Sequence, residues 1–278
     1  MDKRTLAKDL AFRGIGIHSG KVVDLVLRPS DSGEIVFRRK GADGPGLVLD
    51  PRVTGSRNCS YLESEAGRIE TVEHLLASLS AFGVDSLDVE TDGPEIPILD
   101  GSAGPFVEAF AATGTRPAGS GGRILKVTAP FVVAEGGASV EAAPDPGFRI
   151  SYHIAFDHPA IGVQSFDLLV TRESFRTEIA PARTFGFLKD VPELRRRGLA
   201  LGGSFANALV LDDEKLVNGP LRFPDEFVRH KVLDLVGDLF LLGVPVRGHF
   251  TARKAGHALH IKAVRYLLDH PECREYVE

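Results

Sequence analysis

The sequence has few of the features that mark several protein classes. Its 278 residues include only two cysteines, Cys59 and Cys273, and no CxxC pair, which excludes a disulfide framework and a cysteine-rich zinc knuckle. Basic residues are not in excess: the formal net charge is -5, which argues against binding to nucleic acid. No apolar run approaches the ~18 residues of a membrane span, and no signal-peptide core begins the chain. We therefore expect a cytoplasmic protein without stable membrane insertion.

The composition is that of a folded globular protein with two domains. A hydrophobic fraction of 43% and a charged fraction of 26% are ordinary values, and 278 residues suit two domains. The Gly/Pro/Ser-rich segment Thr113–Arg123 is typical of a linker. We therefore expect an N-terminal domain over residues 1–117 and a C-terminal domain over residues 118–278.

Both halves contain runs of strands followed by helices, which indicates an α+β fold and not an alternating βαβ fold. In the first half, predicted strands within 21–51 and at 86–91 accompany helices near 72–82 and 105–113. In the second half, the predicted strands are 124–130, 138–144, 148–156, 164–171 and 246–254, with a last helix at about 258–270. The two halves share a plan, although no identity between them is evident.

The most informative segment is DEFVRHKVLDLVGDLFLLG, in which His230, Asp234 and Asp238 recur every four residues. In a helix these positions share one face, so an imidazole and a carboxylate can point at one ion. Charged residues four apart are also common on solvated helix faces. This helix, however, is apolar over much of its circumference, and an unpaired buried charge is very costly. This polar row, His230, Asp234 and Asp238, therefore needs a partner, and a cation is the obvious one.

A third ligand must come from another segment, and the best candidate is His74, which directly follows Glu73 in GRIETVEHLLASLSAFGV. The pair begins an apolar helix that Thr71 would cap, although adjacent Glu and His residues also occur by chance on surfaces. Two histidines and one carboxylate leave a tetrahedral position open for water, as in a catalytic zinc site. With Glu73 nearby, the pattern predicts a metal-assisted hydrolase whose ion lies between the halves.

Two further histidines have open interpretations. His257, in RKAGHALH, is either a turn residue or a partner of Asp238, whose carboxylate would favour the protonated imidazole. His18 lies in GIGIHSG, which lacks the strand-turn-helix setting of a dinucleotide site, so we expect a hairpin turn that brings His18 near the site. Cys59 is expected to be a small buried hydrophobic residue and not a ligand.

These residues carry a resemblance to a known family. The chain resembles the zinc-dependent UDP-3-O-acyl-N-acetylglucosamine deacetylases, which catalyse the committed step of lipid A synthesis in Gram-negative bacteria. The similar segments are, in order, GIGIHSG, TVEHLLASL, EIPILDGSAGPF, FDHPAI, ARTFGF, RGLALGGSF, EFVRHKVLDLVGDLFLLG and TARKAGHAL. The motifs TVEH, DGSAxPF and HKxLDxxGD, in this order and at these separations, are together highly specific.

The resemblance implies two similar domains, each a two-layer α/β sandwich, that face each other across one Zn2+ ion. The implied zinc ligands are His74, His230 and Asp234. The implied catalytic residues are Glu73, His257, Thr184 and Asp238. The implied substrate-binding residues are Lys231, Phe185, Leu188, Val191, Phe205 and Phe156. The substrate is the small molecule UDP-3-O-acyl-N-acetylglucosamine, and we expect a monomer.

The implied roles follow from the chemistry of amide hydrolysis. Because an amide is a poor electrophile, zinc polarises its carbonyl and brings a bound water toward a pKa of ~7. Glu73 takes the proton of that water, and zinc with Thr184 stabilises the oxyanion. A proton then reaches the departing nitrogen from Glu73 or from His257, which Asp238 supports. The products are acetate and a 2-amino sugar.

The implied substrate contacts have weaker support from the residues themselves. Lys231 is the best cation for the phosphates, and Phe156 lies with Asp157 and His158 in a segment that is near the nucleotide in similar proteins. Segment 185–205 would enclose the acyl chain, with Leu188, Val191 and Leu194 on one helical face. From periodicity alone, ordinary core packing is the more common explanation of that face. The run Arg195–Arg197 is expected to be a solvated helix face.

Two other functions remain open. One is a zinc hydrolase that acts on another N-acyl sugar or on a peptide. The other is a non-catalytic α+β module that binds RNA or protein. The second predicts a basic face and no need to pair His230 and Asp234 with His74. The acidic net charge and the complete polar set disfavour it.

Overall fold

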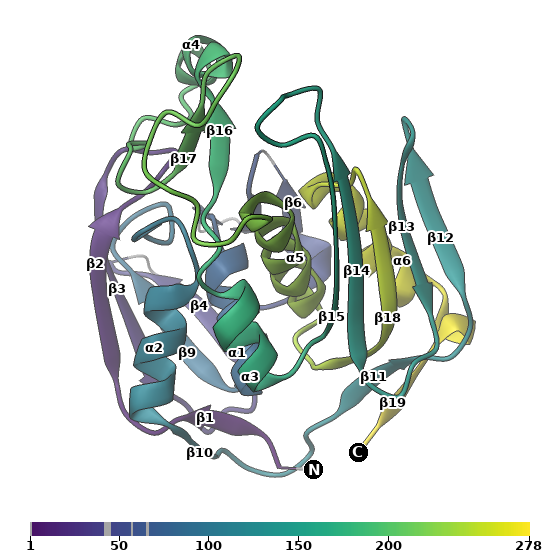
Figure 1. Ribbon diagram of the computed structural model, residues 1–278. Coiled ribbons are helices and arrows are strands. Elements are labelled where there is room, and N and C mark those ends of the chain that lie inside the picture. The colour runs from purple at the N-terminus through teal and green to yellow at the C-terminus, as the bar shows by residue number, and fades with distance from the viewer. Residues whose placement is uncertain (1, 42–45, 57, 65–66) are drawn as a thin grey trace.

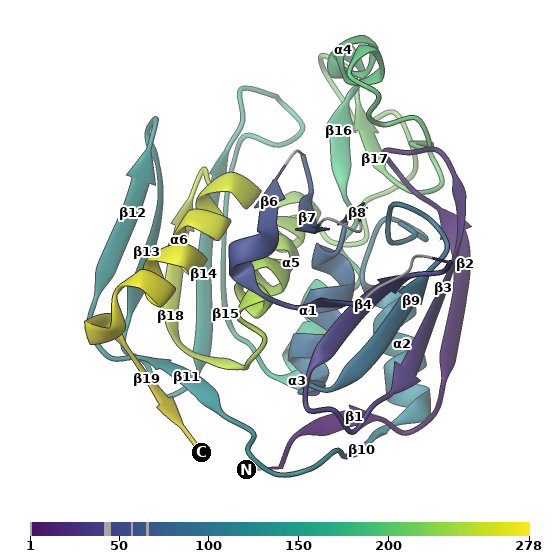
Figure 2. The ribbon, with the colours of Figure 1, turned by 180° about the vertical axis from the view of Figure 1, so that it is seen from behind.

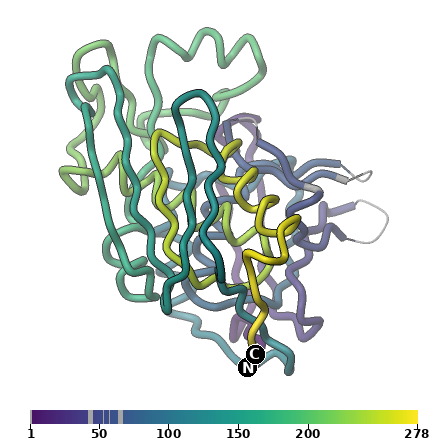
Figure 3. The backbone as a smooth tube through the Cα atoms, turned by 90° about the vertical axis from the view of Figure 1, so that its right-hand side faces the viewer, coloured from purple at the N-terminus to yellow at the C-terminus, as the bar shows by residue number. Residues whose placement is uncertain are grey.

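The computed structural model describes residues 2–41, 46–56, 58–64 and 67–278. Within these residues the chain forms a five-stranded sheet, a seven-stranded sheet and three smaller sheets. The two large sheets lie on opposite sides of the molecule, and helices α1 (Glu73–Phe82) and α5 (Glu226–Leu239) lie between them (Figure 1). Both chain ends lie together at one edge (Figure 3). The predicted α+β class is confirmed.

The five-stranded sheet comes from the first half of the chain and has the order β2-β3-β9-β4-β5. Its strands are β2 (Leu10–Ile15), β3 (Val22–Pro29), β4 (Ile35–Arg39), β5 (Leu47–Val48) and β9 (Leu87–Thr91). Val23, Leu25 and Leu27 of β3 are fully buried, because alternate residues of a strand face the core. Helix α1 and helix α2 (Gly104–Thr113) lie on that inner side (Figure 2). The predicted hairpin turn at GIGIHSG is confirmed, since it joins the antiparallel strands β2 and β3.

Two smaller sheets complete the first half. Strands β6 (Thr54–Ser56), β7 (Ser60–Ser64) and β8 (Gly67–Glu70) form an antiparallel sheet that leads into α1. Strand β1 (Arg4–Leu6) pairs with β10 (Thr115–Pro117). Strand β10 lies inside the segment expected to be a linker, so that prediction is wrong for residues 115–117, whose backbone groups bond to β1 instead of water.

The seven-stranded sheet comes from the second half, and β18 is at its centre. Its strands are β11 (Ile124–Val127), β12 (Phe131–Glu135), β13 (Ala138–Ala143), β14 (Phe148–Ala155), β15 (Val163–Leu169), β18 (Val246–Arg253) and β19 (Arg274–Val277). Strand β18 pairs in parallel with β14 and β11 and antiparallel with β13. Its residues Phe250 and Ala252 are fully buried toward α5 and α6 (His257–Asp269).

A separate segment, residues 172–211, follows β15. Helix α3 (Arg172–Ser174) continues into a π-helical turn, Phe175–Ile179, before the parallel strands β16 (Phe185–Phe187) and β17 (Leu209–Leu211). Between these strands, α4 (Val191–Arg196) stands at the top of Figure 1, away from both large sheets. Leu188 lies in a 3-10 turn, Leu188–Asp190, and not in α4. The turn leads directly into α4, and Leu188, Val191 and Leu194 all line one cavity, so the common face predicted for them is confirmed.

The remaining short helices are the 3-10 turns Pro51–Val53, Phe240–Leu242 and Pro271–Cys273. In the described part of the chain, no helix is both long enough and apolar enough to cross a membrane.

Helices α1 and α5 pack closely because α5 carries a glycine at their contact. A Cβ atom added to Gly237 would lie 2.1 Å from the carbonyl oxygen of Glu73, closer than a real Cβ contact allows. Glycine inside a helix costs roughly 0.5–1 kcal/mol relative to alanine. In return, the start of α1 comes within reach of the polar row on α5, and this contact sets the position of the site.

Candidate metal centre

The polar row predicted on α5 is buried. His230, Asp234 and Asp238 are 3%, 2% and 0% exposed, so the alternative of a solvated helix face is wrong. Most of the other residues of this helix are buried too, as its apolar circumference predicted. The row points toward the start of α1, where Glu73 and His74 are the first two helical residues.

The chain enters α1 by an unusual route. Thr71 was predicted to cap this helix, but that is wrong: the N-cap residue is Val72, and no side chain caps it. Thr71 instead adopts a left-handed backbone conformation with φ 58°, which is costly for a β-branched residue. Its hydroxyl donates to the buried carboxylate of Glu95 at 2.8 Å, and the same carboxylate accepts the backbone N–H of His18. Glu95 therefore stabilises the turn before α1 and so helps to set the position of Glu73 and His74.

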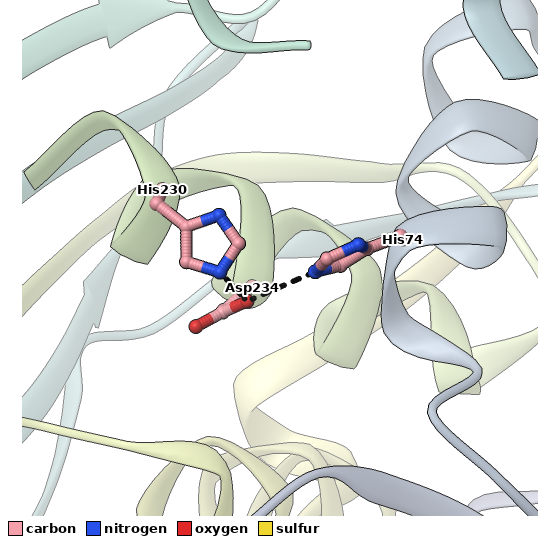
Figure 4. Close-up of side chains that lie close together, drawn as sticks. All are labelled: His74, His230 and Asp234. Carbon is pink, nitrogen blue, oxygen red and sulfur yellow. Dashed lines mark ion pairs between the residues drawn. The ribbon is translucent and has the colours of Figure 1, made fainter. Parts of the chain in front are cut away.

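Three side chains from the two helices converge, and each offers one atom that could bind a metal ion (Figure 4). Asp234 Oδ1 lies 3.4 Å from His230 Nε2 and 3.9 Å from His74 Nε2. Two ligands at zinc bonding distance in a tetrahedral site lie ~3.4 Å apart, so the observed spacing fits one ion of that size. Two imidazoles and a carboxylate are also the donor types that zinc accepts. The residues present therefore fit the expected metal.

Neighbouring groups hold these donors in the forms that bind a cation. The Nδ1–H of His230 donates to the carbonyl of Ala182 at 3.1 Å, which leaves the Nε2 lone pair toward the site. Lys231 Nζ donates to Asp234 Oδ2 at 2.8 Å and leaves Oδ1 toward the histidines. Burial lowers the pKa of His74 to about 3, so its imidazole is neutral. Burial opposes ionisation of Asp234, but Lys231 and His230 outweigh it and hold the pKa of Asp234 well below its usual value.

Glu73 lies beside the donors and is almost fully buried. Its Oε2 accepts the backbone N–H of Ser60 at 3.1 Å, and its Oε1 lies 3.8 Å from His257 Nε2. Burial raises the pKa of Glu73 to about 8, although His257 opposes that shift. A carboxyl group with such a pKa can accept and return a proton near neutrality.

His257 is a partner of Asp238, as one of its two interpretations proposed, and it is also the first residue of α6. Its Nδ1 lies 2.7 Å from Asp238 Oδ2, and its Nε2 is 3.8 Å from Asp234 Oδ2. Burial opposes protonation, but the charges of Asp238 and Asp234 outweigh it and raise the pKa of His257 to about 9. The imidazole is therefore charged, with one N–H toward Asp238 and the other toward the cavity.

Sequence reasoning missed two partners of Asp238. The Nδ1 of His260 lies 2.8 Å from Asp238 Oδ2, and the Ser60 hydroxyl donates to Asp238 Oδ1. The signal for His260 was its position three residues after His257, which places both on one face of α6. Ser60 is on β7, and no local pattern could have linked it to a residue 178 positions away.

These side chains border a cavity of about 1140 Å³. Its wall includes these predicted residues: Glu73, His74, Phe156, Thr184, Phe185, Leu188, Val191, Phe205, His230, Lys231, Asp234 and His257. His18 also lines the cavity, as expected, whereas Asp238 lies behind His257. Thr184 is fixed there by its backbone, since its N–H donates to Gly101 and its carbonyl accepts the N–H of Leu209, both at 2.8 Å.

Other predicted residues lie at the mouth of the cavity, in its wall or apart from it. Leu188 is 41% exposed and Phe205 60% exposed, so they lie at the mouth and not in a core. The run Arg195–Arg197 is not simply a solvated face, because Arg195 and Arg197 line the cavity, while Arg196 pairs with Glu193. His158 is buried, and its Nε2 bonds to the carbonyl of Asp212 at 2.7 Å.

Comparisons with known proteins agree with the geometry. The family profile for UDP-3-O-acyl N-acetylglycosamine deacetylase matches residues 3–269. The chain is 45% identical to the UDP-3-O-acyl-N-acetylglucosamine deacetylase of Myxococcus xanthus, over 99% of this chain and 89% of that protein. It is 43% identical to the protein of the same name from Thermodesulfovibrio yellowstonii, over 99% of this chain and 94% of that one. For Oleidesulfovibrio alaskensis the identity is 45%, with 98% and 90% covered.

Proposed function

The chain belongs to the UDP-3-O-acyl N-acetylglycosamine deacetylase family, and from that premise we propose that it hydrolyses the N-acetyl group of UDP-3-O-acyl-N-acetylglucosamine with one zinc ion. The products are acetate and UDP-3-O-acyl-glucosamine, and the reaction serves lipid A synthesis. The observation that carries the proposal is the convergence of His74, His230 and Asp234 beside Glu73 in one cavity.

In this proposal the three buried donors hold the ion, which supplies a polarised carbonyl and an acidified water. Glu73 Oε1 is the proton acceptor during attack, because the Ser60 N–H holds the other carboxylate oxygen. The Thr184 side chain, which belongs to the same cavity wall, would donate to the amide oxygen. Lys231 keeps Asp234 Oδ2 engaged, so that Oδ1 faces the histidines.

His257 supplies the positive charge. Its Nε2–H faces the cavity 3.8 Å from Glu73 Oε1, and Asp238 fixes the ring through Nδ1. The charged ring stabilises negative charge on the substrate as the amide carbon becomes tetrahedral. A proton then reaches the departing nitrogen from Glu73 Oε1 or from His257 Nε2.

The substrate's acyl chain is proposed to lie along the segment from β16 to β17, residues 185–211. Phe185 contacts Phe156 there, with ring centroids 5.7 Å apart, and Leu188, Val191 and Phe205 continue the apolar wall. Lys231 is proposed to contact the phosphates, but it also bonds to Asp234 at 2.8 Å. His158 has both ring nitrogens engaged by backbone groups, so it is a poor candidate for a nucleotide contact.

We also propose that residues 1–117 and 118–278 are the two domains. Strand β10, which ends at Pro117, pairs with β1 at the start of the chain. The next strand, β11, pairs with β18 and belongs to the seven-stranded sheet. The ion then lies where α1 of one domain meets α5 of the other. The monomeric state and the cytoplasmic location stay predictions.

The direct test is a deacetylation assay with UDP-3-O-acyl-N-acetylglucosamine bearing acyl chains of several lengths, with and without a chelator. We expect turnover that the chelator abolishes and added zinc restores, and metal analysis that finds about one zinc per chain. Turnover only with other N-acyl sugars would favour the rival hydrolase. A folded, metal-free protein without turnover would favour a binding module.

The role of Glu73 has its own test. Glu73→Gln keeps the shape of the side chain but removes the proton acceptor, so kcat should fall by about 10²–10⁴-fold while the metal stays bound. The matched control is Glu63→Gln, which changes an exposed carboxylate that pairs with Arg68 on the surface. Full activity of Glu73→Gln would refute its role as base.

A further inference from the structure

The Asp238 carboxylate is a buried acceptor shared by two histidines. Asp238 and His260 are both 0% exposed, so no solvent compensates for a lost contact. Oδ2 lies 2.7 Å from His257 Nδ1 and 2.8 Å from His260 Nδ1, and Oδ1 accepts the Ser60 hydroxyl. Only His257 borders the cavity; His260 and Asp238 do not.

These distances identify hydrogen bonds and not a second metal site. Asp238, His257 and His260 offer three ligand atoms within 4.8 Å of one another. Two ligands of one zinc ion lie ~3.4 Å apart, however, and contacts of 2.7 and 2.8 Å are those of charge-assisted N–H donors on a carboxylate. Each Nδ1 therefore carries a proton that it donates to Oδ2.

Tyr152 fixes the other side of His260. Its hydroxyl oxygen lies 2.9 Å from His260 Nε2 and 2.9 Å from the carbonyl of Ala255, at the centre of the second sheet's core. Burial lowers the pKa of His260, so the ring that donates from Nδ1 to Asp238 is neutral, and its Nε2 and the Ala255 carbonyl share the one Tyr152 hydroxyl proton. The single charge of Asp238 is then left to balance one cation, His257.

We propose that His260 is a positioning residue for the proposed deacetylation: its Nδ1–H fixes the Asp238 carboxylate, and Asp238 in turn holds the His257 ring with Nε2–H toward Glu73. This inference rests on the proposed function for its kinetic consequences only. The ionised Asp238 carboxylate keeps hydrogen on the Nδ1 of His260, and Tyr152 contacts the opposite side of the ring at Nε2. Without His260, Asp238 Oδ2 loses one of its two donors, and the Ser60 hydroxyl and His257 alone hold the carboxylate.

Three substitutions of His260 separate its two nitrogens. Asparagine places an N–H near the position of Nδ1, glutamine reaches the position of Nε2, and leucine keeps volume without either. For His260→Leu we expect kcat to fall about 10–100-fold with KM and metal content unchanged, since partners of this kind typically contribute that much. His260→Asn should recover most of this loss, and His260→Gln should not.

Histidine NMR of the same proteins tests the geometry without turnover. In 15N-labelled wild-type protein, the His257 Nδ1–H should give a downfield proton resonance typical of a short bond to a carboxylate. His260→Asn should leave that resonance near its wild-type position, and His260→Leu should move it or lose it to exchange. If wild-type protein shows no deacetylation, the proposed function fails, whereas this resonance still decides the positioning role.

A double substitution tests the route of action. If His260 acts through Asp238, adding His260→Leu to Asp238→Asn should lower kcat little further, because the effects of residues that act as a unit are not additive. The proposal is overturned if folded His260→Leu retains both wild-type kcat and the wild-type resonance. It is also overturned if His260→Asn and His260→Leu lose kcat to the same extent. A third contrary result is a double variant whose fold-loss in kcat equals the product of the losses in the two single variants.

Discussion

Asp234 uses its two carboxylate oxygens for different purposes. Oδ1 faces the Nε2 atoms of His74 and His230, whereas Oδ2 accepts a hydrogen bond from the Lys231 ammonium group at 2.8 Å. An ionised carboxylate has about four acceptor sites, so one oxygen can be neutralised by an ammonium group while the other stays available. At the scale of single residues, Lys231 therefore orients a proposed metal ligand without being a ligand itself.

A second buried carboxylate fixes the segment that carries Thr184. Glu226, at the start of α5, accepts three N–H groups of Arg183, from its backbone at 3.0 Å and its guanidinium at 2.8 and 3.1 Å. It also accepts the backbone N–H of Arg222. Because Glu226 is 0% exposed, removing it leaves the Arg183 charge without its partner.

We expect Glu226→Ala to lower the free energy of unfolding by about 3 kcal/mol, the cost of breaking a buried ion pair from one side. Urea denaturation at pH 7 measures this. The matched control is Glu108→Ala, which removes a bidentate partner of Arg176 on the surface and should change stability little. Equal effects of the two substitutions would contradict the argument from burial.

The same carboxylate should affect stability in acid. Burial opposes ionisation of Glu226, but the hydrogen bonds from Arg183 and Arg222 outweigh it and lower its pKa below the usual 4.5. A group with a lowered folded-state pKa stabilises the fold above its unfolded pKa, and this contribution is lost as the pH falls through the folded pKa. Denaturation between pH 5 and 3 should thus show a steeper loss of stability for the wild type than for Glu226→Gln. Identical slopes would exclude the linkage.

At the scale of elements, the contact between α1 and α5 depends on Gly237. Alanine at this position would place its Cβ 2.1 Å from the Glu73 carbonyl oxygen, so the helices must separate. Separation moves Glu73 and His74 away from the ligands on α5. We expect Gly237→Ala to lose several kcal/mol of stability, as overpacked cores do, and to bind zinc more weakly.

Thermal unfolding and titration with a chromogenic chelator measure the two effects. Gly186→Ala is the control, because nothing lies within 4 Å of an added Cβ there and its backbone is not left-handed. It should unfold and bind metal like the wild type. A fully metal-loaded, stable Gly237→Ala protein would show that the close approach of the helices is not required.

The elements also show what the sequence could predict. The spacing of His230, Asp234 and Asp238 predicted one helix face, since periodicity is local and α5 is long enough to reveal it. Burial of that face followed from the apolar residues around it. His74, Glu73 and His257 were candidates from their own segments, the family resemblance implied their roles, and all three lie beside α5.

What the sequence could not predict depends on partners far along the chain. From the sequence alone, Gly237 is only a residue that destabilises a helix. Its packing role becomes evident once α1 is known to lie against it. The left-handed conformation of Thr71 is stabilised by Glu95, and the position of His260 matters only because Asp238 approaches from another helix. The apolar residues between β16 and β17 line a cavity and do not pack in a core, which the family resemblance implied but periodicity alone could not show.

At the scale of the whole molecule, the proposed ion joins the two large layers. His74 belongs to a helix on the inner side of the five-stranded sheet, whereas His230 and Asp234 belong to a helix on the inner side of the seven-stranded sheet. An ion bound only in the folded state should therefore stabilise the arrangement of both halves together.

Chelation should lower the unfolding temperature for this reason. A ligand present at a thousand times its dissociation constant stabilises the fold by about 4 kcal/mol, which corresponds to a shift of roughly 10 °C for a protein of this size. Differential scanning calorimetry with and without a chelator measures the shift. His230→Ala should unfold at one temperature in both conditions, because it lacks a ligand. His249→Ala, on the outer face of β18 beside Ser151, should respond like the wild type. If chelation lowers the unfolding temperature of His230→Ala as much as that of the wild type, the stabilising ion is bound elsewhere.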